Sequence, residues 1–435
     1  MQDRFARLKA LRPPSPSNTS EVAWQPALPH IRTQPQTARA VPDGSDRLEQ
    51  ILGTSAKANQ YGEHLVLHSW FGEPARYTPD LQALRLLMPN PAEDLADPEQ
   101  WLFLDIETTG LAGGSGTYAF LVGVAWREAG GLEIEQFFMR DYSEECSLLF
   151  ALGERLAERR VLVTFNGKSF DWPLLETRYR MNRKIPPPVP LAHLDFLHPA
   201  RNLWRLRLGS VRLSELERHV LGWDRGADLT SDLIPRIYLD FVRGAPPEQL
   251  IPVFHHNQMD LRGLAGLSSR ILSLLSDVET QGEDGLELFG VSRICERRGD
   301  SVRARKLYEK SIATVLPAET DRSARRLLAR LAKRDGDFAV ACELWSSALG
   351  NSFEGYEAYE QLAIYHEHNA RDPRRAREIV CQALDELRRA NRTGTINSSA
   401  YHQISARFER RMGRLERKSM GPLLNVVDMG LRSGY

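Results

Sequence analysis

Two acidic residues lie two positions apart in the apolar stretch FLDIETTGL, residues 103–111. They are Asp105 and Glu107, and the apolar residues around them predict a buried strand. Because side chains alternate across a strand, we expect both carboxylates on the same face. Two negative charges in a poorly solvated setting repel each other. The pair therefore predicts a cation bound between the two carboxylates.

Two further aspartates are placed to join this pair. Asp171, in FNGKSFDWPLL, lies near the start of a predicted helix directly after a strand, and Asp260, in HHNQMDL, lies in a later predicted helix. Four carboxylates offer only oxygen ligands, which select hard ions, so Mg²⁺ is favoured with Mn²⁺ as a substitute. Two such ions can activate a water and stabilise a leaving oxygen, as hydrolysis of a phosphodiester requires.

The elements that must hold these residues follow an α/β pattern. Three predicted strands, joined by short turns, favour an antiparallel meander and span residues 101–106, 118–126 and 132–140. A helix over 144–158, a buried strand over 160–167 and a helix over 169–181, with Pro173 in its first turn, follow. We therefore predict a mixed sheet of ribonuclease-H-like order, with three antiparallel strands followed by parallel strands and helices.

Four motifs occur in order between about residues 61 and 275: DIETTGL, TFNGKSFDWPLL, LDFLHPARNLWRLRLGSVRLSELERHVLG and HNQMDL. In them the sequence resembles the DEDD exonuclease superfamily, and more closely its YprB-like bacterial branch. The resemblance implies a two-metal 3′–5′ exonuclease that acts on single-stranded nucleic-acid ends. It also implies that Asp105, Glu107 and Asp171 hold one ion. The other ion would rely largely on Asp105 and the substrate phosphate, with Asp260 completing the cluster.

Two adjacent histidines are candidates for the general base that deprotonates the attacking water. His256 stands four residues before Asp260, which puts both on one face of a helix, whereas His255 stands five residues before it and about 140° away. Histidine-type superfamily members usually have H-x₄-D, which fits His255, while the YprB-like pattern H-N-x-x-D fits His256. We assign the role to His256 and keep His255 as the alternative.

Residues beside the acidic motifs are candidate substrate contacts, namely Thr108, Leu111, Asn166 and Lys168. The resemblance implies that Leu111, in a glycine-rich stretch, wedges at the terminal base. Asn166 and Lys168 lie beside Asp171, where a substrate contact and a purely structural turn are equally expected.

Two other signals have a plainer interpretation. GKS at residues 167–169 is not the end of a nucleotide-binding loop, because that motif would need glycine at Leu162. The basic cluster in ARNLWRLRLGSVR predicts phosphate contacts and a solvated helix face equally; it comprises Arg201, Arg205, Arg207 and Arg212.

The chain is predicted to have three parts. Residues 1–45 are rich in proline and serine and predict a disordered arm and linker, and residues 61–275 form the exonuclease-like domain. Beyond them the pattern is helical, and three helix–turn–helix units carry turn aspartates 37 and 35 residues apart, namely Asp300, Asp337 and Asp372. This spacing is near the tetratricopeptide period, so we predict tetratricopeptide-like repeats over 286–420, with irregular helix pairs as the alternative.

Composition limits the class of protein. Lysine plus arginine equals aspartate plus glutamate at 57 each, so nucleic-acid binding must depend on local basic patches. The four cysteines lie far apart without a C-x-x-C pair, which argues against structural zinc and disulfides. No apolar run approaches membrane-spanning length, and no signal-peptide core follows the start. We therefore expect a cytoplasmic protein without a membrane partner.

Two functions from different classes fit these features. The first is the metal-dependent exonuclease, whose helical repeats recruit a protein partner or guide the substrate. The second is a catalytically silent nucleic-acid-binding scaffold whose repeats bind a protein partner. The complete set of acidic ligands favours the first, because a decayed site is expected to lose a costly buried carboxylate. The residues do not distinguish DNA from RNA.

Overall fold

The computed structural model describes residues 44–72, 80–110, 116–128, 130–226, 228–281, 284–349 and 355–419. Of the arm predicted over residues 1–45, all but the last two residues lie outside this part of the chain, and those two begin α1 (Gly44–Leu52). No helix in the described ranges is both long enough and apolar enough to cross a membrane.

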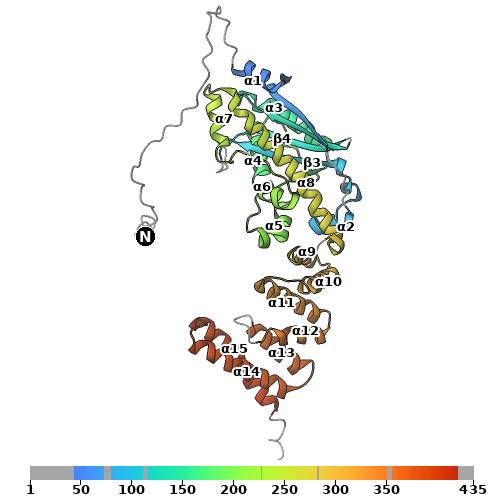
Figure 1. Ribbon diagram of the computed structural model, residues 1–435, viewed down its shortest axis with the longest axis vertical. Helices are drawn as coiled ribbons and strands as arrows, with labels where there is room; N and C mark the ends of the chain where they lie inside the picture. The colour runs from blue at the N-terminus through green and yellow to red at the C-terminus, as the bar shows by residue number, and fades with distance from the viewer. Residues whose placement is uncertain are drawn as a thin grey trace, which may run out of the picture. The chain divides into compact units, whose positions relative to one another are not determined.

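A mixed sheet of seven strands, in the order β1-β2-β5-β4-β3-β6-β7, forms the centre of the N-terminal part (Figure 1). Its strands are β1 (Ala56–Asn59), β2 (Gly62–Gly72), β3 (Trp101–Thr108), β4 (Ala119–Glu128), β5 (Gly131–Phe138), β6 (Val161–Thr164) and β7 (Ala192–Asp195). Strands β3, β4 and β5 form the predicted antiparallel meander, and β6 and β7 extend the sheet in parallel with β3. The α/β prediction with a mixed sheet is confirmed. Because β1 precedes residue 61, the sheet begins before the predicted start of the domain.

Side chains of β3 alternate between two apolar cores. Trp101 and Phe103 belong to one core, whereas Leu102, Leu104 and Ile106 belong to the other. Asp105 continues the alternation on the face of Trp101 and Phe103. On this face it meets the helix α8.

Helices cover both faces of the sheet and supply the remaining parts of the site. They are α2 (Leu81–Leu87), α3 (Glu145–Glu158), α4 (Asp171–Met181), α5 (Leu197–Leu208), α6 (Leu213–Leu216), α7 (Ile234–Val242) and α8 (Ile251–Gln281). Helices α3 and α4 begin within two residues of their predicted starts at 144 and 169. The long helix α8 packs against β3, β4 and β5, and Figure 1 shows it crossing the sheet.

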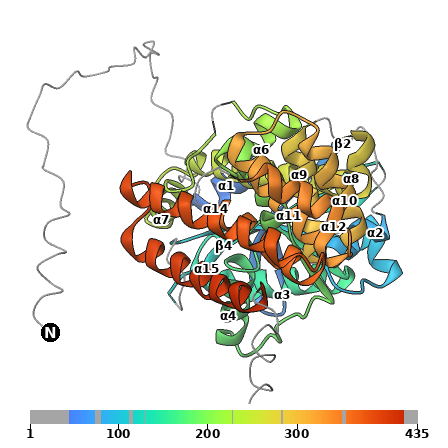
Figure 2. The same ribbon diagram turned by 90° about the horizontal axis from the view of Figure 1, so that it is seen from below.

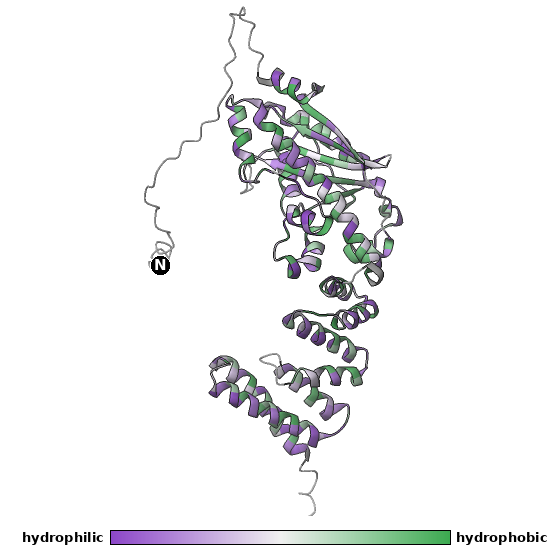
Figure 3. Cartoon of the chain, in the orientation of Figure 1, coloured by the Kyte–Doolittle hydropathy of each residue, from purple (hydrophilic) through white to green (hydrophobic). Residues whose placement is uncertain are grey.

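The C-terminal part is helical, as predicted. It contains α9 (Gly285–Arg297), α10 (Ser301–Ile312), α11 (Ala318–Arg334), α12 (Phe338–Ser347), α13 (Gly355–His368), α14 (Pro373–Arg392) and α15 (Ser398–Ser419). The turn aspartates Asp300, Asp337 and Asp372 are N-caps, and each carboxylate accepts a backbone N–H three residues onward. Figure 2 shows α14 and α15 running side by side, and Figure 3 shows hydrophilic and hydrophobic stretches on each of these helices.

The apolar core does not stop where the helical region begins. Trp204 of α5 and Val291 of α9 lie in the same cluster as Phe103 of the sheet. The indole N–H of Trp204 donates to a carboxylate oxygen of Glu287 at 2.7 Å. At Gly290 a Cβ atom would stand 2.6 Å from the backbone oxygen of Asn202, so only glycine lets α9 approach α5 this closely. Helix α9, the first helix of the C-terminal part, is therefore packed directly onto the sheet-containing part.

Candidate metal centre

All four predicted carboxylates and His256 line one pocket of about 190 Å³, which we call the acidic pocket. Asp105 and Glu107 come from β3, Asp171 is the first residue of α4, and His256 and Asp260 come from α8. The pocket opens at the carboxyl ends of the parallel strands β3 and β6, where ligands bind in open α/β sheets.

Local backbone features direct the ligands into the pocket. The register of β3 against β4 shifts between Glu107 and Thr108, and such bulges re-aim side chains at the ends of strands. Asn166, just after β6, has a φ of 71°, in the left-handed region that asparagine tolerates better than most residues. The carboxylate of Asp195, at the end of β7, accepts the backbone N–H groups of Asn166 at 2.9 Å and Lys168 at 3.0 Å. Asp195 thereby holds the turn that leads into Asp171.

A contact between α8 and the sheet fixes Asp105. The side-chain amide of Asn257 donates to Oδ2 of Asp105 at 2.8 Å. It reaches this oxygen over Gly123, the residue of β4 that is paired with Asp105. A Cβ atom on Gly123 would lie only 2.1 Å from Oδ1 of Asn257, so the crossing needs glycine.

The negative charges of these carboxylates repel one another. Burial raises the pKa of Asp105 well above its usual range, and the negative charges of Asp260, Glu107 and Asp171 raise it further. Burial also raises the pKa of Glu107, with Asp260 the next cause. Burial, followed by Asp195 and Asp260, raises the pKa of Asp171 to about 7. This is the electrostatic signature of a site that gains from a bound cation.

The two candidate histidines have different surroundings. His256 is buried and lines the acidic pocket, whereas His255 is exposed and is not among the residues that line it. Nδ1 of His256 lies 2.8 Å from Oδ1 of Asp228, and Nε2 lies 3.6 Å from Oδ2 of Asp260. Burial opposes the ionisation of Asp228, but hydrogen bonds from His256 and Arg225 outweigh it, and the pKa of this carboxyl is lowered. An ionised Asp228 accepts the proton of Nδ1, which leaves the lone pair on Nε2 facing the pocket.

One arginine neutralises part of this charge. Arg225 donates to Oδ1 of Asp260 at 2.5 Å and to Asp228 at 3.0 Å, and it also pairs with the buried carboxylate of Glu217. In the described part of the chain, no lysine or arginine forms an ion pair with Asp105, Glu107 or Asp171. The carboxylates on β3 and α4 thus lack the counter-ion that Asp260 has.

The donor set suits a divalent cation. One oxygen each from Glu107 and Asp260 and one ring nitrogen of His256 lie within 4.8 Å of one another. The oxygens of Asp105 and Asp171 line the same pocket and extend the set. Carboxylate oxygens are the ligands of Mg²⁺ and Mn²⁺, and Mn²⁺ also accepts an imidazole nitrogen. The residues present therefore fit such an ion.

The candidate substrate contacts do not all lie in the same pocket. Thr108 and Asn166 line the acidic pocket, and Lys168 lines a neighbouring hollow. Leu111 lies outside the described residues. In the basic cluster, Arg207 pairs with Asp284 at 3.0 Å, whereas Arg201 and Arg205 are exposed on α5.

Sequence reasoning missed the residues that position the ligands. These are Asp195, Arg225, Asp228 and Asn257, which act through contacts with residues from 28 to 152 positions away in the sequence. Two of them stand in motifs quoted above: Asn257 is the asparagine of the H-N-x-x-D pattern, and Asp195 is the second residue of LDFLHPARNLWRLRLGSVRLSELERHVLG. Arg225 and Asp228 stand in a stretch without a motif of its own.

Comparison with known proteins supports the same fold. A family model described as the RNase_H superfamily matches residues 102–272. The uncharacterized protein YprB of Bacillus subtilis (strain 168) is 31% identical over 289 residues, which cover 65% of this chain and 69% of that protein. Among solved structures, the family B DNA polymerase from the hyperthermophilic archaeon Pyrobaculum calidifontis is a distant likeness, with 17% identity and a TM-score of 0.33 over 49% of this chain and 28% of that chain. Since the identity to YprB exceeds 30% and extends over more than two thirds of that protein, the chain belongs to the YprB-like family of the ribonuclease H superfamily.

Proposed function

We propose that the protein is a metal-dependent 3′–5′ exonuclease that hydrolyses phosphodiester bonds at single-stranded nucleic-acid ends. The observation that supports this most is the convergence of four carboxylates, from β3, α4 and α8, on the acidic pocket. Three of them have no ion pair with a lysine or arginine of the described residues. Keeping such a cluster is costly unless cations bind to it.

Asp105, Glu107, Asp171 and Asp260 would hold two Mg²⁺ ions, with Mn²⁺ as a substitute. When bound, two such ions supply a nucleophile at neutral pH and offset the charge on the leaving oxygen. His256 accepts the proton of the attacking water at Nε2, because Asp228 holds the proton of Nδ1. Asp228 is in this scheme a positioning residue, which fixes the orientation of the imidazole ring. Thr108 and Asn166 line the pocket where the terminal nucleotide would lie.

The silent scaffold is a second candidate, and one contact favours it. The guanidinium of Arg225 already pairs with Asp260, as a counter-ion would in a site that binds no metal. In that case the tetratricopeptide-like repeats over 286–420 would carry the function by binding a protein partner. In the exonuclease proposal the same repeats guide the substrate in the cytoplasm.

Assays with end-labelled oligonucleotides distinguish the exonuclease from the silent scaffold. We expect the full chain, with Mg²⁺ or Mn²⁺, to shorten 5′-labelled single strands stepwise and to release the label of 3′-labelled strands first. A chelator should stop both reactions. Parallel DNA and RNA strands identify the substrate. Absence of hydrolysis with either metal, together with retained binding of the strands, would support the scaffold instead.

A further inference from the structure

Three hollows lead from the acidic pocket along the first helices of the repeat region. The first, of about 360 Å³, is lined by Lys168 and Arg297 and lies between α2, α5 and α9. The second, of about 650 Å³, shares Arg297 with the first. The third, of about 320 Å³, shares Arg326 and Arg330 with the second. We call the three hollows together the basic groove.

The groove begins at the acidic pocket. Lys168, in its first hollow, belongs to the same turn as Asn166, which lines the acidic pocket, and Asp195 accepts the backbone N–H groups of both residues. A strand whose end lies in the acidic pocket therefore meets the groove directly beyond this turn.

Positive charge dominates the lining of the groove. Nine lysine and arginine side chains and five carboxylates line the three hollows, in a chain whose formal net charge is zero. Neither Arg293 nor Arg297 forms an ion pair with a carboxylate of the described residues. Burial, and then the neighbouring charge of Arg293, lowers the pKa of Arg297, as expected where cations outnumber their partners.

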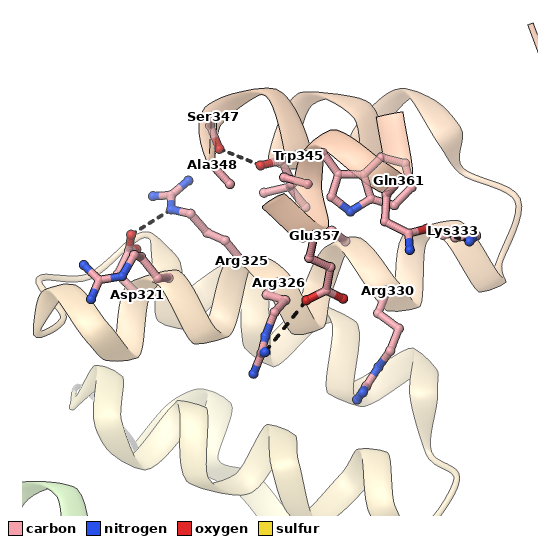
Figure 4. A pocket seen from close by; sticks show the side chains of 14 residues that line it. Asp321, Arg325, Arg326, Arg330, Lys333, Trp345, Ser347, Ala348, Glu357 and Gln361 are labelled. Atoms are coloured by element: carbon pink, nitrogen blue, oxygen red, sulfur yellow. Dashed lines mark hydrogen bonds and ion pairs between the residues drawn. The ribbon is translucent and has the colours of Figure 1, made fainter. Parts of the chain in front are cut away.

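The third hollow presents its cations in a row. Arg322, Arg325, Arg326, Arg330 and Lys333 lie on one face of α11, at spacings of three, four, eight and eleven residues from the first. The row is about 16 Å long. Figure 4 shows Arg325, Arg326 and Arg330 projecting from this helix near Glu357 and Trp345. Arg326 and Arg330 are 49% and 64% exposed, so they remain accessible to an anion although each has a carboxylate nearby.

We propose that the basic groove binds the phosphate backbone of the single strand whose 3′ end lies in the acidic pocket. This proposal rests on the proposed function and adds the path of the substrate. An acidic peptide would match the charge of the groove equally well. It would not account for a groove that starts at the turn leading into Asp171, which is where a bound strand must leave the pocket. A nucleic-acid strand accounts for both features.

Binding of strands of two lengths tests the groove. The full chain with Arg326→Gln and Arg330→Gln is compared with wild type on single strands of about 4 and about 20 nucleotides, in chelator so that nothing is hydrolysed. Both substitutions replace exposed partners of ion pairs, which contribute little to stability, so the fold should persist. A matched control carries Arg375→Gln and Arg388→Gln on α14, where each arginine pairs with a carboxylate three residues away and neither lines the groove.

For the long strand we expect the groove variant to bind about tenfold more weakly than wild type. The slope of log K against log salt concentration should become shallower by about 1.4, since each lost phosphate contact on a single strand contributes about 0.7. The short strand should bind both proteins alike, and the control should match wild type. Equal affinity and slope of variant and wild type on the long strand would overturn the proposal. So would a polyglutamate peptide that binds wild type more tightly than the long strand and loses its affinity in the groove variant.

The same samples separate this proposal from the exonuclease proposal. Hydrolysis of the short strand by wild type with Mg²⁺ or Mn²⁺ depends on the acidic pocket alone. If it occurs while the groove variant binds the long strand normally, only the groove proposal fails. If no strand is hydrolysed while the variant loses affinity for the long strand, the groove proposal stands and the exonuclease proposal fails.

Discussion

Nδ1 of His256 and Oδ1 of Asp228 lie 2.8 Å apart, a contact that joins α8 to the loop before α7. An acceptor at Nδ1 determines which nitrogen of a neutral imidazole carries the proton. A carboxylate in this position also stabilises the charged ring once it has accepted a second proton. The pair is therefore suited to proton transfer, and it can be tested without altering any proposed metal ligand.

Asp228→Asn should lower kcat by about 10- to 100-fold with little change in KM, because the ring loses its orientation and its partner charge only where the proton moves. Steady-state kinetics on a short single strand measures both constants. Asp232→Asn, at an exposed aspartate of the same loop, is the matched control and should resemble wild type. A rise in KM at unchanged kcat would show that Asp228 serves binding instead.

His256→Ala should lower turnover by about two to four orders of magnitude at saturating Mg²⁺, since general base catalysis contributes that much. His255→Ala should leave turnover near the wild-type value, because His255 is exposed and does not line the acidic pocket. The reverse result would assign the general base to His255, in the H-x₄-D arrangement. If both variants turned over normally, neither histidine would be the base.

Asp105→Asn should abolish hydrolysis and raise the melting temperature of the metal-free protein, because one of the mutually repelling carboxylates becomes neutral. Wild type should gain stability when Mg²⁺ or Mn²⁺ is added, by about 2.7 kcal/mol at a hundredfold excess over Kd. The variant should gain far less. Calorimetry with and without chelator measures these shifts independently of activity, and equal shifts for both proteins would contradict the metal assignment.

Gly123→Ala should destabilise the protein by about 1 to 3 kcal/mol and reduce activity, because the added methyl group would displace Asn257 and Leu261 of α8. Urea unfolding and the hydrolysis assay follow the two effects. Gly413→Ala is a suitable control, since a Cβ there meets no atom within 4 Å and the residue lies within α15. That change should be neutral or slightly stabilising. An active and fully stable Gly123→Ala protein would show that α8 can shift without consequence.

The pH dependence of stability should reveal a buried ion cluster in the helical C-terminal part. Glu367 of α13 is fully buried and pairs with Arg411, Arg414 and Lys418 of α15. Burial alone would raise its pKa, but the hydrogen bonds from Arg414 and Lys418 outweigh burial and lower the pKa to about 2. A lowered pKa stabilises the fold above the ordinary value of 4.5, and this contribution is lost as the pH falls from 4.5 towards 2.

Glu367→Gln should therefore cost about 3 kcal/mol at pH 6 and progressively less below pH 4.5. Urea unfolding of the full chain at several pH values measures the difference. Glu378→Gln removes an exposed partner of Arg375 and should cost less than about 0.5 kcal/mol at every pH. A cost for Glu367→Gln that stayed constant down to pH 3 would contradict the assignment of the lowered pKa.

The parts of the fold that could be predicted are those with a strong local pattern. The strand that became β3 was predicted to within a few residues because it is a short continuous apolar run. Helix α3 was predicted from the helical period of its apolar residues, and α4 from its position after a buried strand and from Pro173 in its first turn. The strand β2 was missed, since its C-terminal half alternates between half-exposed and exposed residues and contains His68 and Ser69. The strand β7 has only four residues, too few for a periodic signal.

The same limit applies to the site. Asp105 and Glu107 were found because their spacing of two residues is meaningful within one strand. Asn257 and Asp105 are 152 residues apart, and no local pattern relates them. Their contact depends on the absence of a side chain at Gly123, a third residue on another strand. Such relationships follow from how α8 crosses the sheet, which becomes known only with the fold.

The close packing of α9 against α5 at Gly290 should determine the length of strand at which digestion ends. Backbone that packs this tightly leaves α9 little freedom to move, so the third hollow of the basic groove keeps its separation from the acidic pocket. If the proposed function holds, a strand that reaches both would be retained between successive cuts, and shortening should be processive. Once the strand no longer spans that separation, it is held at one end only and dissociates readily. Digestion should then leave limit products of one characteristic length, set by the distance between the acidic pocket and the third hollow.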